Sequence, residues 1–383
     1  MPREGRHEHV HNALVVCKDT GAANAFSAFF KNLTDSKIHL SSICVDYAVN
    51  VFKKNGLQPT KESPKDLTEN QVEHILDELR PDALLLGTSF DSWTERYFCK
   101  HARERGIPCV GLVDWWSNFG ARFSTPQSTD LSYMPDAIAV MDEDARLGCI
   151  ADGIPKEIIH IIGNPYWDDL IATKENTVQL HMQIRKKLGI PKHTLLAMVF
   201  SSNIRNLPLH LGYDEYDFWD ALLPLPEYTC QQVPIQWALK PHPRENRQDN
   251  IDMMKTFNIS PLLVDTLSGI EAIAAADFVI GMCSSVLFEA ALLGKKVVSL
   301  QPGLSTGKLE YLRIFDRISV PKIVNVSEVK GVINRLLNDD IAYPTLTNIP
   351  APIGKGTATA ALQELLIADL HKKTKRMHEK GTV

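Results

Sequence analysis

Short apolar runs alternate with longer amphipathic stretches through the first 163 residues. In the stretch 69–80, apolar residues three or four positions apart share one helical face: Val72, Ile75, Leu76 and Leu79. This alternation is typical of βα units on a parallel sheet. The predicted strands of this part are residues 12–17, 38–45, 83–87, 109–113, 136–141 and 158–163.

A second round of the same pattern begins near residue 195, with predicted strands at 195–200, 235–239, 261–264, 278–280 and 297–300. The chain has 383 residues, more than one hydrophobic core usually serves. We therefore expect an α/β protein with two Rossmann-like lobes. Residues 1–165 form the first lobe, residues 166–191 form a linker, and residues 192–350 form the second lobe. Residues 351–383 contain a helix that starts at 357 and packs back on the first lobe, and a basic tail follows it.

The composition and net charge exclude some classes of binding partner. With 44% hydrophobic residues and a net charge of -5, the chain has no field that would attract nucleic acid. The seven cysteines are scattered singly, as in a reducing cytoplasm, and no apolar run reaches about 18 residues. A basic cluster at 371–376 is compatible with contact to anionic lipid at the inner face of a membrane, or with a solvated helix end.

The predicted second lobe contains a strand, a tight turn and a helix within residues 277–295. Ser284 and Ser285 stand where the helix begins, and Glu289 follows one turn later. Unpaired N–H groups at a helix start, together with two hydroxyls, form a site suited to nucleotide phosphates. A carboxylate at Glu289 could accept both hydroxyls of a ribose.

Two more loops follow strands of the same lobe. Lys240, His242 and Arg244 alternate with two prolines after residues 235–239, which places one imidazole between two cations that could neutralise a phosphate. The other loop contains Ser201 and Ser202 after residues 195–200. Ligands of doubly wound sheets bind at the carboxyl ends of strands, so these loops are candidates for one nucleotide site.

These segments resemble the donor-binding elements of GT-B glycosyltransferases, including the bacterial sialyltransferase-like and CDP-glycerol transferase groups with their K-x-H-P motif. Residues 163–168 are similar to the strand exit that precedes the interlobe linker in that fold. The resemblance implies metal-independent, inverting transfer in which His242 stabilises the departing phosphate. It also implies a set of donor-binding residues: Ser201, Ser202, Lys240, His242, Arg244, Ser284, Ser285 and Glu289.

In the first lobe, three polar loops follow the strands that end near residues 17, 87 and 113. The first loop lacks the G-x-G-x-x-G spacing, which disfavours a dinucleotide oxidoreductase. Asp114 is followed by two tryptophans, and sugar rings stack on aromatic faces while a carboxylate takes a hydroxyl proton. Asp19 and Asp114 are the candidate catalytic bases, although Asp19 could simply cap a helix. The candidate acceptor-binding residues are Asn24, Ser89, Trp115, Trp116 and Asn118.

These first-lobe loops also resemble those of a group of bacterial surface-carbohydrate proteins, without implying a firm activity. Asp142 and Asp144 match the D-x-D pattern of metal-dependent transferases, but they open a predicted helix, so we expect no metal. An aromatic and acidic stretch at 205–228 covers the nucleotide, meets the acceptor, or forms a helix that packs its aromatic side inward.

The leading hypothesis is a glycosyltransferase that moves a sugar, preferably a CMP-linked acidic one, to a glycan, polysaccharide or glycolipid acceptor, with no cofactor beyond the nucleotide sugar. One alternative is a hydrolysing UDP-N-acetylglucosamine 2-epimerase or a nucleotide-sugar hydrolase of the same fold, which needs acid and base groups on both sides of the sugar. The D-S-G-G turn of those enzymes is replaced here by Cys283, Ser284 and Ser285. The second alternative is a non-catalytic carbohydrate-binding protein.

Overall fold

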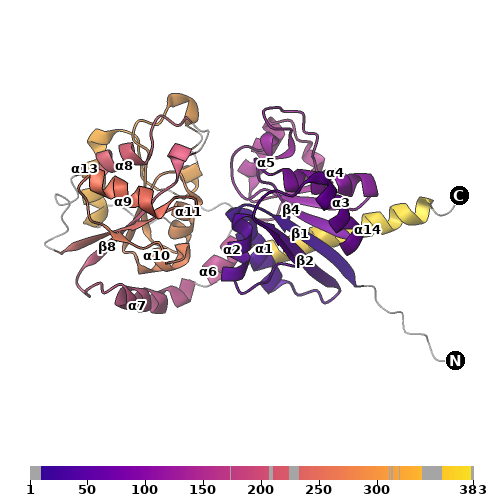
Figure 1. Cartoon of the computed structure of the whole chain (residues 1–383), viewed down its shortest axis with the longest axis horizontal. Coiled ribbons are helices and arrows are strands. Elements are labelled where there is room, and N and C mark those ends of the chain that lie inside the picture. The colour runs from indigo at the N-terminus through magenta and orange to yellow at the C-terminus, as the bar shows by residue number, and fades with distance from the viewer. Residues whose placement is uncertain are drawn as a thin grey trace. The chain divides into compact units, whose positions relative to one another are not determined.

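The chain divides into two compact units. The computed structural model describes residues 10–172, 174–206, 210–223, 233–309, 311, 314–318, 320–338 and 356–380. One unit comprises Met1–Asp169 with Pro350–Val383, and the other comprises Leu170–Ile349. Figure 1 shows a sheet covered by helices in each unit. The α/β class with two Rossmann-like lobes, predicted from the sequence, is confirmed.

The first unit contains a seven-stranded parallel sheet in the order β3-β2-β1-β4-β5-β6-β7. Its strands are β1 (His11–Cys17), β2 (Ile38–Val45), β3 (Lys61–Ser63), β4 (Ala83–Gly87), β5 (Cys109–Leu112), β6 (Ala137–Val140) and β7 (Ile159–Ile161). The strand order reverses between β1 and β4. Loops on either side of such a point diverge and leave room for a ligand.

Helices cover both faces of this sheet. They are α1 (Thr20–Asn32), α2 (Tyr47–Lys54), α3 (Glu69–Leu79), α4 (Trp93–Arg105), α5 (Glu143–Ala151) and α6 (Pro165–Ala172). Alternate residues of β1 point to opposite faces, as a two-residue strand period requires. Val15 packs with Phe26 of α1 and Phe52 of α2, whereas Leu14 packs with residues of α3 and α4 such as Phe98.

The C-terminal helix α14 (Ala358–Lys380) joins the first core through four leucines, as predicted: Leu362, Leu365, Leu366 and Leu370. Its start is fixed by Asp168 of α6, whose Oδ2 accepts a hydrogen bond from the Ala358 amide at 2.8 Å. The side chains of the basic cluster at 371–376, and the loop that precedes residue 356, lie outside the described residues. Within the described residues, no helix is long and apolar enough to cross a membrane.

The second unit contains a six-stranded parallel sheet in the order β10-β9-β8-β11-β12-β13. Its strands are β8 (Leu195–Phe200), β9 (Ile235–Lys240), β10 (Leu262–Leu263), β11 (Phe278–Gly281), β12 (Lys296–Leu300) and β13 (Lys322–Ile323). Its helices include α7 (Thr177–Lys187), α8 (Glu215–Leu222), α9 (Arg247–Thr256), α10 (Gly269–Ala275), α11 (Ser285–Leu292) and α13 (Val326–Leu337).

Two strands were missed by the hydrophobic pattern. β3 reads Lys-Glu-Ser and β13 has only two residues, and each lies at an edge of its sheet. Neither contains an apolar run that a sequence could reveal. Of the alternatives for the aromatic stretch after β8, the structure shows inward packing, because Phe218 and Trp219 of α8 are buried in the core. Part of that stretch, residues 207–209 and 224–228, lies outside the described residues.

Candidate functional site

In the second unit, three loops begin at the same edge of the sheet. Phe200, the last residue of β8, pairs with Lys240 of β9 on one side and with Gly281 of β11 on the other. All three strands are parallel, so the residues that follow them lie at the same edge of the sheet. The predicted loops of Ser201, His242 and Ser284 are therefore neighbours, and the strand order reverses there between β8 and β11.

The two serines after β8 have different environments. The Ser201 hydroxyl donates to Glu245 Oε1 at 2.6 Å, and the Glu245 Oε2 atom accepts the His242 amide at 2.8 Å. Ser201 thus links two loops. The Ser202 side chain is also buried, but its hydroxyl has no hydrogen-bond partner among the described residues. A buried polar atom without a partner is costly unless a ligand satisfies it, which makes Ser202 the hydroxyl available to an anion.

His242 is a neutral imidazole in this environment. Burial lowers its pKa, and together with the positive charges of Arg244 and Lys240 brings it to about 4. The Nδ1 atom accepts the Arg244 amide at 3.2 Å, so the ring proton is on Nε2. The ring can therefore donate a hydrogen bond to a phosphate oxygen while the flanking cations supply charge. The lysine is held in place by the Asp265 carbonyl, 3.2 Å from its Nζ.

Helix α11 begins at the same edge. Ser284 is its N-cap, and the Ser284 hydroxyl accepts the Val286 amide at 3.4 Å. The Ser285 hydroxyl donates to Glu289 Oε1 at 3.3 Å, so this serine lies along the helix beside the carboxylate that we assigned to the ribose. The backbone N–H groups of the first turn and the helix dipole favour an anion here.

Two carboxylates that support this site lie outside the motifs identified in the sequence. Glu245 belongs to the loop after β9, and Glu215 on α8 accepts the backbone amides of Ile204 and Arg205. Glu215 is buried and holds the loop that follows β8. Neither residue is part of a motif, and only the folded chain shows which amides they reach.

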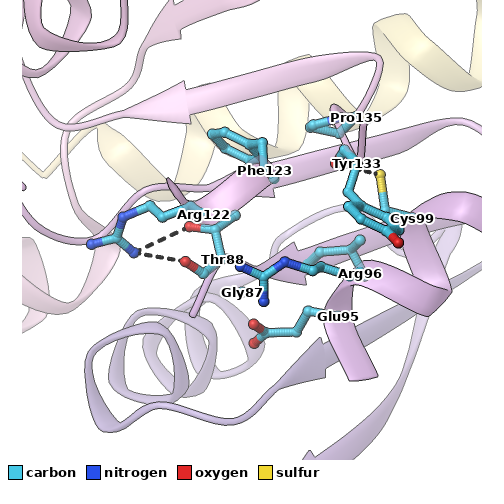
Figure 2. Close-up of a pocket in the computed structure, with 11 residues that line it drawn as sticks. Gly87, Thr88, Glu95, Arg96, Cys99, Arg122, Phe123, Tyr133 and Pro135 are labelled. Atoms are coloured by element: carbon cyan, nitrogen blue, oxygen red, sulfur yellow. Dashed lines mark hydrogen bonds between the residues drawn. The ribbon is translucent and has the colours of Figure 1, made fainter. Parts of the chain in front are cut away.

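In the first unit, Asp114 lies between a cation and a helix start. Its Oδ1 accepts a hydrogen bond from Arg122 Nη1 at 3.0 Å, and the same nitrogen donates to the Thr88 carbonyl at 2.9 Å. Figure 2 shows the two bonds from Arg122 to Thr88. A Cβ atom placed on Gly21, in the first turn of α1, would overlap Asp114 Oδ2. Asp114 therefore reaches across β4 to the loop that follows β1.

Asp19 precedes this same turn. It occupies the N-cap position of α1, but its side chain makes no capping hydrogen bond, so simple helix capping does not explain it. The side chain is half-buried. Asn24, one turn further along α1, is also half-buried, and Ser89 is buried in the loop after β4. Asp19, Ser89 and Asp114 thus come from the loops after β1, β4 and β5, which are neighbours in the sheet.

Glu95 is a further carboxyl group at this edge, and the sequence analysis missed it. It lies in the first turn of α4, is 4% exposed, and accepts the amides of Ser89 at 2.7 Å and Lys18 at 3.1 Å. Burial and the nearby negative charge of Asp19 raise its pKa to about 8. Figure 2 places Glu95 next to Arg96 and Gly87 at a pocket of this unit.

The tryptophans after β5 pack against one another. The Trp116 side chain is buried, its Nε1 donates to both carboxylate oxygens of Asp142 at 2.8 and 2.9 Å, and its ring stacks on Trp167 with centroids 5.3 Å apart. Trp115 is half-buried and tilted against Trp116. Asn118 is exposed, with a left-handed backbone at φ 57°. Sugar stacking stays a prediction, and for Trp116 it would require displacement of Trp167.

Asp142 caps α5 by accepting the Ala145 amide at 2.8 Å, in agreement with the capping interpretation of the D-x-D pattern. In the described part of the chain, no group of three or more histidine, cysteine, aspartate or glutamate side chains is arranged to hold a metal ion. The absence of a metal requirement stays a prediction.

Comparison with known proteins identifies relatives that extend over almost the whole chain. No family model matches the sequence. A protein of Ralstonia nicotianae named "Probable UDP-N-acetylglucosamine 2-epimerase" is 22% identical, over 89% of this chain and 90% of its own length. A protein of Ralstonia solanacearum with the same name is 20% identical over the same shares.

Solved structures match the fold of this chain. The UDP-GlcNAc 2-epimerase from Neisseria meningitidis, bound to UDP-GlcNAc, matches with a TM-score of 0.72 and 14% identity over 93% of this chain and 100% of that chain. The UDP-GlcNAc 2-epimerase from Methanocaldococcus jannaschii gives a TM-score of 0.65 and 13% identity, over 93% and 99%. The chain therefore has the GT-B-like two-lobed fold that these nucleotide-sugar enzymes share.

These findings show that the glycosyltransferase hypothesis is wrong, because the full-length relatives and the structural neighbours are 2-epimerases. The correction includes the transferase class and the inverting transfer with a preferred CMP-linked donor, and nothing supports a glycan acceptor. The physical reason is that loops of this kind recognise phosphates and a ribose, and these groups are the same whether the sugar is transferred or epimerised. The 2-epimerase alternative agrees better with the comparisons.

Proposed function

We propose that this chain is a nucleotide-sugar 2-epimerase acting on a UDP-linked 2-acetamido sugar such as UDP-N-acetylglucosamine. The observation that carries the proposal is the anion site of the second unit. The proposal is also supported by a relative that this chain matches over 90% of that relative's length and that bears the epimerase name. Its components are the unpartnered Ser202 hydroxyl, the neutral His242 ring and the start of α11. These groups bind the diphosphate, and other residues make the proton transfers.

Inversion at C2 requires that a proton leave one face of the sugar, while the electron pair of the C2–H bond forms a C1=C2 double bond and the diphosphate oxygen leaves C1. A proton must then arrive at C2 on the opposite face as the diphosphate returns to C1. Two acid–base groups are therefore needed. We assign them to Asp19 and Asp114, because the loops after β1 and β5 bring these carboxylates to the same turn of α1. Both proton transfers are then made by side chains of this chain, and the reaction needs no metal or cofactor.

Solvent hydrogen provides the decisive test, because epimerisation exchanges the hydrogen at C2. The protein is incubated with UDP-N-acetylglucosamine in D2O containing EDTA, and the sugar is followed by proton NMR. We expect loss of the C2 proton signal and the appearance of the 2-epimer. The Glu143→Gln variant, which changes an exposed carboxylate on α5, serves as the control and should behave as the unmodified protein. Recovery of the sugar with its C2 proton intact would refute the proposal.

The nucleotide base is tested separately by thermal stability. UDP, CMP, CDP and GDP are compared at equal concentration, since a ligand at 100 times its dissociation constant stabilises the folded state by about 2.7 kcal/mol. We expect UDP to raise the melting temperature most. A shift confined to CMP or GDP would contradict a UDP-linked substrate.

The two serines after β8 should respond in opposite ways to replacement by alanine. Ser202→Ala removes a buried hydroxyl without a partner, so the free protein should melt at the same or a higher temperature. The same change removes a donor to the phosphate and should weaken UDP binding by about tenfold, because a hydrogen bond to a charged group contributes roughly 1.5 kcal/mol or more.

Ser201→Ala is the matched comparison. It leaves the Glu245 carboxyl without its 2.6 Å partner and should destabilise the free protein by about 1–3 kcal/mol. Calorimetric titration with UDP and thermal unfolding measure both effects. Equal losses of stability in the two variants would show that the Ser202 hydroxyl is not an unpartnered group available to a ligand.

A further inference from the structure

Two consecutive residues at the start of α4 connect the loops of the first unit. Arg96 donates to four backbone carbonyls, those of Phe90 (2.8 Å), Ser92 (2.5 Å), Ala121 (2.8 Å) and Ser124 (2.8 Å). The guanidinium group thereby joins the loop after β4 to the segment after β5 that contains Arg122. Arg96 is buried, and this set of carbonyls explains how a cation is accommodated there.

Glu95 makes the second connection, between the loops after β1 and β4. Its Oε2 accepts the Ser89 amide at 2.7 Å, and its Oε1 lies 3.1 Å from the Lys18 amide and 3.3 Å from the Ser89 hydroxyl. A Cβ atom on Gly87 would lie 2.5 Å from Oε1, so the carboxyl group fits only because residue 87 is glycine. Lys18 directly precedes Asp19, one of the two assigned acid–base groups.

The charges around Glu95 disfavour a second anion. The negative charge of Asp19 acts on it from the end of β1, whereas the Cys17 thiol is neutral because burial raises its pKa, and Arg96 follows Glu95 on the same helix. Within the described residues, Glu95 forms no ion pair: the Lys18 ammonium group lies 3.1 Å from Asp66 and 3.7 Å from Asp91, and Arg96 is occupied by carbonyls. A buried carboxylate without a counter-ion is costly, so the protonated form is favoured at neutral pH.

We propose that Glu95 is a positioning residue for the proposed reaction: its two oxygens accept the amides of Lys18 and Ser89 and so hold the peptide of Lys18 and Asp19 against the loop of Ser89. Ionisation of Glu95 would place a second negative charge beside Asp19 and oppose this arrangement. The inference rests on the proposed function for the role of Asp19. The link between the two loops rests on the hydrogen bonds alone.

A glutamine cannot replace this carboxyl group fully. The Oε1 atom of a carboxyl group can accept both the Lys18 amide and the Ser89 hydroxyl, whereas an amide nitrogen in its place can only donate. With its oxygen on the Ser89 amide, a glutamine would direct N–H towards the N–H of Lys18. Glu95→Gln should therefore release the Lys18–Asp19 peptide without creating a cavity.

The kinetic test compares the unmodified enzyme with Glu95→Gln across pH 6–10. We expect the unmodified enzyme to lose turnover as the pH rises through the raised pKa of Glu95, about 8. Glu95→Gln should lower kcat by about 10–100-fold at pH 7, as expected for a misplaced catalytic group, and change KM little. It should also lack the alkaline decline. Glu143→Gln, an equivalent change in the first turn of α5, should keep the unmodified profile.

Two further measurements do not need activity. Hydrogen exchange of the Lys18 and Ser89 amides should accelerate in Glu95→Gln and stay unchanged in Glu143→Gln. Thermal stability should also depend on pH. The pKa of Glu95 is raised from 4.5 to about 8 in the folded state, so its contribution is fully present below pH 4.5 and is lost as the pH rises to 8. Across that window the unmodified protein should lose stability relative to Glu95→Gln.

The outcomes separate the two proposals. If the unmodified enzyme does not exchange the C2 hydrogen but the amide exchange and pH effects appear, the epimerase proposal fails while the loop connection stands. If the unmodified enzyme is active, and Glu95→Gln keeps its kcat, its alkaline decline and slow exchange at Lys18, the positioning role is refuted.

Discussion

The Asp114→Asn variant is expected to turn over UDP-N-acetylglucosamine about 10²–10⁴ times more slowly than the unmodified enzyme, the usual contribution of one acid–base group. The amide keeps the size of the side chain and an oxygen for Arg122, which lies 3.0 Å away. It loses the ability to take a proton. Asp19→Asn should fall in the same range, because each face of the sugar needs its own group.

Folding must be separated from chemistry in this test. Thermal unfolding of each variant checks that the first unit is intact, and UDP binding should be unaffected because the anion site lies in the second unit. Asp144→Asn, an exposed position on α5, is the matched control. Turnover within about threefold of the unmodified enzyme in Asp114→Asn would remove this residue from the acid–base pair.

Gly21→Ala is expected to reduce turnover about 100-fold without unfolding the protein, because a small displacement of a catalytic group has effects of this size. The added methyl group would occupy the position of Asp114 Oδ2, so the carboxylate must move. Gly21 is the second residue of α1, and the preference of a helix for alanine over glycine offsets part of the cost of moving Asp114. Activity should therefore fall much more than stability.

The control for this variant lies in the second unit. Gly331 is in α13, and a Cβ atom there would meet nothing within 4 Å, so Gly331→Ala should leave turnover unchanged. Steady-state kinetics and thermal unfolding measure both variants. Full activity in Gly21→Ala would show that the carboxylate of Asp114 need not stay where the structure places it.

The corrected function shows what a motif can and cannot specify. The turn of His242 and the start of α11 both lie at the same edge of the second sheet, where the carboxyl ends of its strands meet. Their hydrogen-bonding groups suit a nucleotide, which the resemblance also implied. They do not distinguish transfer from epimerisation, because that choice depends on what lies next to the reacting carbon.

Sequence reasoning could locate the loops but could not rank the residues within them. Ser201 and Ser202 are adjacent and chemically identical in the sequence, yet one is bonded to Glu245 and the other is unpartnered. Nothing in the sequence distinguishes Glu95 from other residues of its helix. Its role depends on amides contributed by residues 77 and 6 positions away. A pattern that reports only neighbours along the chain does not record such distances.

The sequence by itself determined the two α/β lobes, most of their strands and the edge at which polar loops gather. Hydrophobic periodicity is local, and burial in a parallel sheet requires continuous apolar runs, so these features can be recognised one segment at a time. Only the tertiary structure decided which hydroxyl has no hydrogen-bond partner among the described residues, which carboxyl group is buried and where Asp114 lies. Hydrogen bonding and desolvation in those places depend on groups that meet only when distant segments fold together.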